Sequence, residues 1–145
     1  MPEKAGDFMA EAAPQGKVDV REHPLSPHLQ VYRFMLTMMM SIMHRITGAG
    51  LYLGTLLLAW WLIAAATSAS AFATASWFMG SILGRLILFG FTWALFHHLL
   101  GGIRHAIWDV GRGMQHPERE FLAQATLIGG IALTILVWIA AYMAR

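Results

Sequence analysis

Three long apolar segments are the feature that most restricts the fold of this chain. No aspartate or glutamate occurs between Glu22 and Asp109, and 57% of the 145 residues are hydrophobic. Charged residues make up only 12% of the chain, about half the usual share of a soluble domain. Such a stretch is too long and too apolar for the surface of a small water-soluble protein. The sequence therefore predicts an all-α integral membrane protein.

Each apolar segment is long enough to cross a bilayer as a helix. The first uninterrupted apolar stretch, 46–66, would extend about 31 Å, against a hydrocarbon core of roughly 30 Å. We expect an N-terminal segment at 1–33, transmembrane helices at 34–67, 79–110 and 121–144, and connections at 68–78 and 111–120.

The basic residues are distributed unevenly among the segments between the spans. The N-terminal segment and the entrance of the first span carry several, and Arg112 and Arg119 lie between the second and third spans. The connection at 68–78 has none. Because cytoplasmic loops carry an excess of Lys and Arg, we expect 1–33 and 111–120 in the cytoplasm and 68–78 in the periplasm. No basic patch is interleaved with aromatic residues, so a nucleic acid partner is not expected.

Small residues at helical spacing indicate close packing between helices. The pairs Gly50-x3-Gly54 and Gly80-x3-Gly84 have the spacing that lets helix backbones approach one another. Three spans form a poor independent bundle, however. We therefore expect the chain to work inside a complex.

Two adjacent histidines lie within the second apolar segment. Between Arg85 and Arg104 the only ionisable residues are His97 and His98, and such groups inside a bilayer are usually functional. A haem is one interpretation, because His98 shares a helix face with Gly102, where no side chain would meet a porphyrin. The alternatives are hydrogen bonds across a helix interface and a proton relay. Either histidine satisfies the spacing for a haem ligand.

The neighbours of His98 favour it over His97. His105 lies in line with His98, roughly 10 Å further along the helix, where it and Arg104 could meet haem propionates. His44 is the only other histidine near a span, and its expected place at the mouth of the first helix is too shallow for a second axial ligand. We therefore expect that ligand to come from another subunit.

Ser41 and Arg45, at the entrance of the first span, form a candidate quinone site. They are four residues apart and share a helix face. A hydroxyl donor and a fixed cation suit a quinone oxygen, which gains negative charge on reduction. The alternative is a helix-capping serine beside an arginine that only sets the topology.

Three motifs together resemble the cytochrome b556 subunits of succinate dehydrogenase. They are Pro24-Leu-Ser-Pro-His-Leu-Gln-Val-Tyr32, Ser41-Ile-Met-His-Arg-Ile-Thr-Gly48 and His98-x3-Gly-Ile-Arg-His105, followed by Asp109 and Gly111. The resemblance implies that His98 is the haem iron ligand and that Ser41 and Arg45 bind quinone. It also implies that His44, Arg45, Arg104 and His105 lie at the haem propionates or support the ligand.

The same resemblance implies a respiratory complex in which this chain catalyses nothing alone. A flavoprotein subunit with FAD oxidises succinate, and an iron–sulfur subunit passes electrons toward the membrane. This chain and the second small anchor share one haem b and form the ubiquinone site. The acidic residues Glu3, Asp7 and Glu11 argue against a transit peptide, so a bacterial inner membrane is favoured over a mitochondrial one.

Three other functions fit parts of the pattern. A fumarate reductase anchor would have the same architecture and work in the quinol-oxidising direction. A transporter or proton-channel subunit would need a polar stripe through several spans. A purely structural anchor would leave the histidines without a role.

Overall fold

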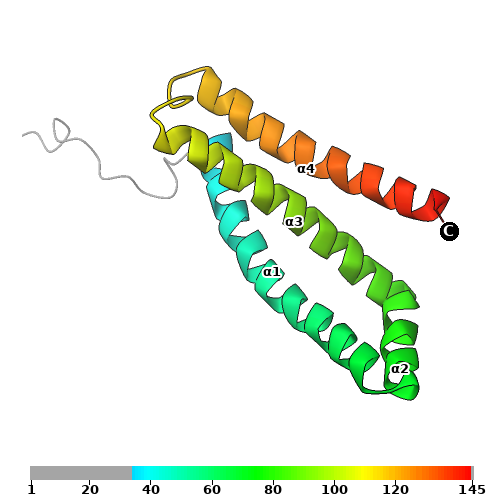
Figure 1. The fold of residues 1–145 in the computed structure, drawn as a ribbon. Helices are drawn as coiled ribbons and strands as arrows, with labels where there is room; N and C mark the ends of the chain where they lie inside the picture. The colour runs from blue at the N-terminus through cyan, green and yellow to red at the C-terminus, as the bar shows by residue number, and fades with distance from the viewer. Residues whose placement is uncertain (1–33, 145) are drawn as a thin grey trace, which may run out of the picture. The chain divides into compact units, whose positions relative to one another are not determined.

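The structure, a computed structural model, describes residues 34–144. The expected N-terminal segment 1–33 and its Pro24–Tyr32 motif lie outside this range. Three helices of the described part are long and apolar enough to cross a membrane: α1 (Leu36–Thr67), α3 (Ile82–Asp109) and α4 (Glu118–Met143) (Figure 1). The predicted fold class, an all-α membrane protein with three transmembrane helices, is confirmed.

A shorter helix, α2 (Ala69–Gly80), occupies most of the segment expected to be a simple connection. Two serines with extended backbone separate it from its neighbours. The Oγ of Ser68 accepts a hydrogen bond from the N–H of Ala71 at 3.2 Å, and the Oγ of Ser81 accepts one from the N–H of Gly84 at 3.1 Å. Each serine therefore caps the helix that follows it, so the chain turns at both points.

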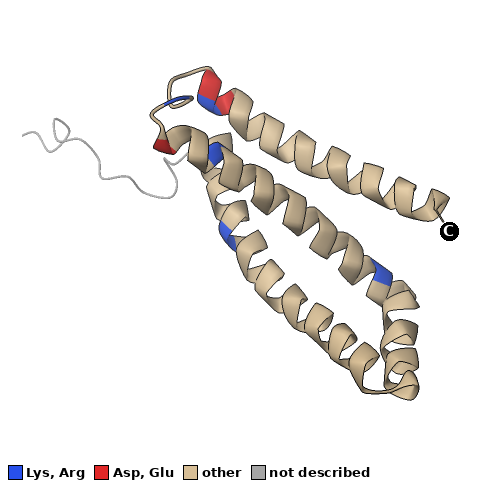
Figure 2. Cartoon of the chain, viewed as in Figure 1, with Lys and Arg blue, Asp and Glu red and all other residues tan. Residues whose placement is uncertain are grey.

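The loop between α3 and α4 is closed by two glycines in the left-handed region, Gly111 (φ 75°) and Gly113 (φ 72°). The indole Nε1–H of Trp108 donates a hydrogen bond to the carbonyl of Gly113 at 2.9 Å. Glu118 and Glu120 then lie in the first turn of α4, where a carboxylate is favoured by the helix dipole. Figure 2 shows the acidic residues of the described chain around this loop.

Helix α3 lies between α1 and α4 (Figure 1), and glycines bring the helices close. A Cβ atom on Gly54 would collide with the ring of Phe91, and one on Gly84 would collide with the backbone of α2. Gly50 and Gly80 have open space where a Cβ would be. One glycine of each predicted pair therefore makes the close contact and the other does not.

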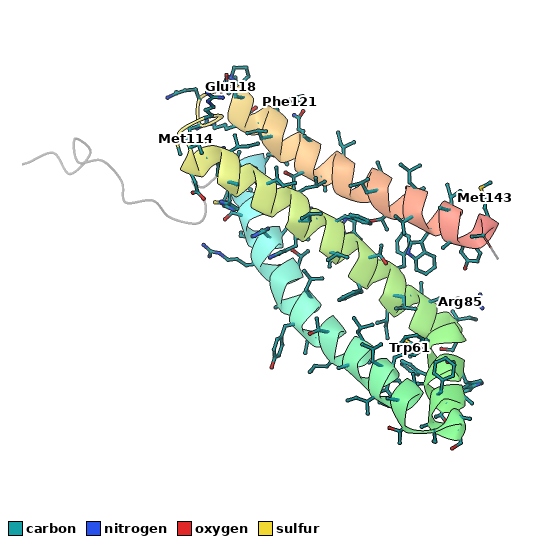
Figure 3. The ribbon with its side chains drawn as sticks, in the orientation of Figure 1. Trp61, Arg85, Met114, Glu118, Phe121 and Met143 are labelled. Atoms are coloured by element: carbon teal, nitrogen blue, oxygen red, sulfur yellow. The ribbon has the colours of Figure 1, made fainter. Side chains whose placement is uncertain are left out.

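The buried apolar core consists mainly of small side chains. Its members are Met40, Ala64, Ala75, Ala94 and Ala123, whereas large apolar side chains cover the outside. Phe121 and Met143, labelled near the two ends of α4 in Figure 3, are 69% and 82% exposed. An apolar surface of this extent needs lipid or a partner protein to cover it.

Candidate functional site

His98 and His44 form the centre of the site, at the contact between α3 and α1. Their imidazole rings are stacked, with centroids 3.9 Å apart and an angle of 6° between the planes. The Nδ1 of His98 lies 3.0 Å from the carbonyl oxygen of His44 and 3.4 Å from the hydroxyl of Thr47. A carbonyl only accepts hydrogen bonds, so Nδ1 carries the proton and the Nε2 of neutral His98 keeps its lone pair.

Two glycines make room for this pair of rings. A Cβ on Gly48 of α1 would lie 3.0 Å from the Cε1 of His98. A Cβ on Gly101 of α3 would collide with the ring of His44. Each helix therefore provides a histidine and the glycine that accommodates the histidine of the other helix.

Contrary to the expectation from the sequence, His44 is not shallower than His98. Their stacked rings place the two residues at the same level of the helix pair, and His44 lies about 12 Å inside α1. Because their rings are in face-to-face contact, nothing fits between them, and His44 is not placed across an iron atom from His98.

His97 points to a different helix from His98. Its side chain is fully buried, its backbone lies against Gly130 of α4, and its ring stacks on Trp93 at 5.2 Å between centroids. Neither ring nitrogen of His97 has a hydrogen-bond partner among residues 34–144. Helix α4 covers this position, so His97 is the less accessible of the two candidate ligands.

The side of α3 that carries His98 is open one turn further on. A Cβ on Gly102 would have nothing within 4 Å, so α3 is uncovered one turn beyond His98. The described residues hold no group of three His, Asp or Glu side chains able to bind a bare metal ion. An iron atom at His98 would therefore need its other ligands from a porphyrin and a partner.

Arg104 and His105 lie on different sides of α3. Arg104 is 2% exposed, and none of its three guanidinium nitrogens has a hydrogen-bond acceptor within the described chain. Its guanidinium carbon is 5.1 Å from the centre of the Trp108 ring. His105 is half-buried, with its ring centroid 5.2 Å from that of His44. A buried guanidinium without an acceptor is costly, so Arg104 is a candidate partner for an anion.

Ser41 and Arg45 lie one turn apart near the start of α1, as expected. Ser41 is half-buried and Arg45 is exposed, and neither side chain forms a hydrogen bond or ion pair within residues 34–144. The N-cap of α1 is Met35, so Ser41 is inside the helix. The alternative interpretation of Ser41 as a helix cap is therefore wrong.

Thr47, Gly48 and Gly101 were not predicted as site residues. The hydroxyl of Thr47 donates to the carbonyls of its own helix, at 2.9 Å to Met43 and 3.0 Å to His44. Some signal for them was present in the sequence, since Thr47 and Gly48 belong to the Ser41–Gly48 motif and Gly101 lies beside Gly102. Their contacts could not be predicted, because these depend on how α1 and α3 are aligned.

Three helices long and apolar enough to cross a membrane, with histidine and arginine side chains between them, define a transmembrane protein. Comparison with known families identifies which one. The chain belongs to the succinate dehydrogenase/fumarate reductase transmembrane subunit family, whose model matches residues 19–137.

Individual relatives agree with this family. The succinate dehydrogenase cytochrome b556 subunit of Paracoccus denitrificans is 49% identical over 116 residues, 80% of this chain and 89% of the relative. The protein of the same name from Rickettsia felis is 32% identical over 81% of this chain and 92% of its own length. The mitochondrial cytochrome b560 subunit of Sus scrofa is 39% identical over 66% of this chain and 57% of that protein.

Proposed function

We propose that this chain is a haem b-binding membrane anchor of succinate dehydrogenase and forms part of its ubiquinone-reduction site. The observation that carries the proposal is the hydrogen bond between His98 Nδ1 and the His44 carbonyl. A histidine that binds a metal usually donates its other ring N–H to such an acceptor, which fixes the tautomer and the ring orientation. The relatives named as cytochrome b subunits support the same assignment.

In this proposal His98 is the axial ligand that this chain supplies to one haem b. The second ligand comes from the second small anchor subunit, because His44 stacks against His98 instead of facing it across an iron atom. A bound haem b accepts and releases single electrons. Arg104, which has no acceptor within residues 34–144, and His105, beside His44, would hold the negatively charged propionates.

Ser41 and Arg45 hold the quinone in this proposal. A quinone carbonyl oxygen accepts a hydrogen bond from the serine hydroxyl, and the guanidinium stabilises the negative charge that develops during reduction. Both side chains are available, since neither has a partner in the described chain. Ubiquinone takes up two electrons and two protons to become the quinol. The electrons come from succinate through the FAD of the flavoprotein subunit and the clusters of the iron–sulfur subunit.

A fumarate reductase anchor is the second candidate, because the family includes both enzymes. There the same residues would bind quinol and stabilise the loss of its protons. A proton channel is disfavoured by α4. The hydroxyls of Thr126 and Thr134 donate to carbonyls of their own helix, at 2.8 Å and 2.7 Å, so they do not form a polar path.

The bacterial inner membrane is the proposed location. Relatives from Paracoccus denitrificans and Rickettsia felis cover most of this chain, and the three long apolar helices fit a multi-pass protein.

A reduced-minus-oxidised visible spectrum of the detergent-purified complex tests the proposal, with succinate as the reductant. We expect sharp b-type bands that appear on adding succinate. Bands that appear only with dithionite would retain the haem but leave open the direction of electron transfer and the quinone partner. An intact complex without any b-type band would overturn the role of His98.

A further inference from the structure

Arg85 is a cation without a counter-charge among residues 34–144, at the end of α3 opposite to the loop 110–117. It lies in the first turn of α3, is exposed, and forms no ion pair within residues 34–144. The acidic residues of that part of the chain are Asp109, Glu118 and Glu120. Asp109 is about 36 Å away along α3, so no carboxylate of the described chain reaches Arg85.

Arg85 lines a cavity of about 500 Å³ with a polar and aromatic rim. Trp61 of α1 and Trp138 and Tyr142 of α4 form much of its wall. The indole Nε1–H of Trp138 is fixed by a hydrogen bond of 3.3 Å to the hydroxyl of Thr92. Figure 3 labels Arg85 and Trp61 at the same end of the bundle. Tryptophan and tyrosine are enriched where a membrane protein meets the lipid head groups.

An apolar cavity of about 300 Å³ adjoins the first one. The two share Trp61, Met79 and Leu88, so they form one groove with a cation at one part and only apolar side chains at the other. The apolar part lies between α1 and α3 and includes Leu57 and Phe91.

We propose that this groove binds an anionic phospholipid, with its phosphate at Arg85 and an acyl chain in the apolar part. Arginine forms paired hydrogen bonds with phosphate oxygens, and basic pockets between transmembrane helices bind phospholipid head groups. A carboxylate from a partner protein would neutralise Arg85 but leave the adjoining apolar cavity empty. A quinone is uncharged and would leave Arg85 without a counter-charge. An amphiphile with a negative head group satisfies both parts of the groove.

The test uses the complex purified in detergent and washed free of endogenous lipid. Phosphatidylglycerol and phosphatidylcholine with identical acyl chains are titrated separately, and bound lipid and Tm are followed by native mass spectrometry and thermal unfolding. We expect phosphatidylglycerol to remain bound and raise the Tm. In Arg85→Gln the titration midpoint should move to an about tenfold higher concentration, the expected loss for a charge-assisted hydrogen bond. Arg112→Gln, in the loop at the other end, should behave as the wild type.

Leu57→Phe tests the apolar part separately. The larger side chain should weaken phosphatidylglycerol binding without lowering the Tm measured in detergent alone. Four results would overturn the proposal: equal binding of the two lipids, an unchanged midpoint in Arg85→Gln, an equal Tm rise with inorganic phosphate, or displacement of the lipid by ubiquinone.

Discussion

At the scale of single residues, the structure separates two histidines that are adjacent in sequence. His98 contacts α1, and its hydrogen bond leaves Nε2 available. His97 is enclosed against α4, and neither of its ring nitrogens has a hydrogen-bond partner within residues 34–144. We predict that His98→Leu abolishes or shifts the b-type haem spectrum. His97→Leu should retain the spectrum at wild-type amplitude, because it removes only buried polar atoms that lack partners.

Both histidine variants are compared in the purified complex by visible spectroscopy and by haem content per subunit. Equal amounts of assembled complex provide the control for folding. The reverse result, with haem lost in His97→Leu and kept in His98→Leu, would make His97 the ligand.

Arg45 allows a prediction about turnover, since it is exposed and forms no ion pair in the described chain. Arg45→Leu should leave the complex assembled but lower succinate–ubiquinone reductase activity by about 100-fold, the usual effect of removing one charge-stabilising donor. Succinate oxidation with a soluble dye acceptor should remain at the wild-type rate. Arg112→Leu is the matched control, and normal ubiquinone reduction in Arg45→Leu would remove Arg45 from the quinone site.

At the scale of helices, apolar length and composition were sufficient to predict the three spans. Helix α2 was missed because a short segment of alternating small and polar residues has no apolar run of spanning length. The expected start of the first helix, residue 34, was two residues from the observed start at Leu36. The sequence placed His44 at the helix mouth because the uninterrupted apolar stretch begins only at residue 46. Gly48 leaves room for the ring of His98, and Gly101 leaves room for the ring of His44. Both contacts depend on how α1 and α3 are aligned, which the local sequence does not specify.

The contact between α3 and α4 depends on Gly130. A Cβ there would lie 3.3 Å from the Cα of His97, so the neighbouring backbone would have to move. We predict that Gly130→Val destabilises the complex by about 1–3 kcal/mol through overpacking, measured as a lower Tm. Gly129→Ala is the matched control, because its Cβ would meet only the flexible end of Leu100 and alanine favours the helix. An unchanged Tm in Gly130→Val would show that α4 does not pack this closely in the assembled protein.

At the scale of the whole described chain, the buried polar groups and the exposed apolar surface both indicate that the protein works in a complex. Polar groups with no partner, His97 and Arg104, are enclosed between the helices, while large apolar side chains face outward. Lipid acyl chains cover an apolar surface but supply no acceptor to a buried guanidinium such as that of Arg104. In the proposed complex, a cofactor and partner subunits would have two separate roles: they would cover apolar area and supply the missing acceptors.

The orientation of the helices is tested with the cysteine-free chain. The basic residues predict that the loop 110–117 faces the cytoplasm and that α2 faces the periplasm. A single cysteine at Ser70 should react with a membrane-impermeant maleimide in intact spheroplasts. One at Gln115 should react only after the membrane is permeabilised. Both positions are exposed in the described chain, and labelling in denaturant shows that each cysteine is reactive. The opposite pattern would invert the topology and place Ser41 and Arg45 at the periplasmic face, away from an iron–sulfur subunit in the cytoplasm.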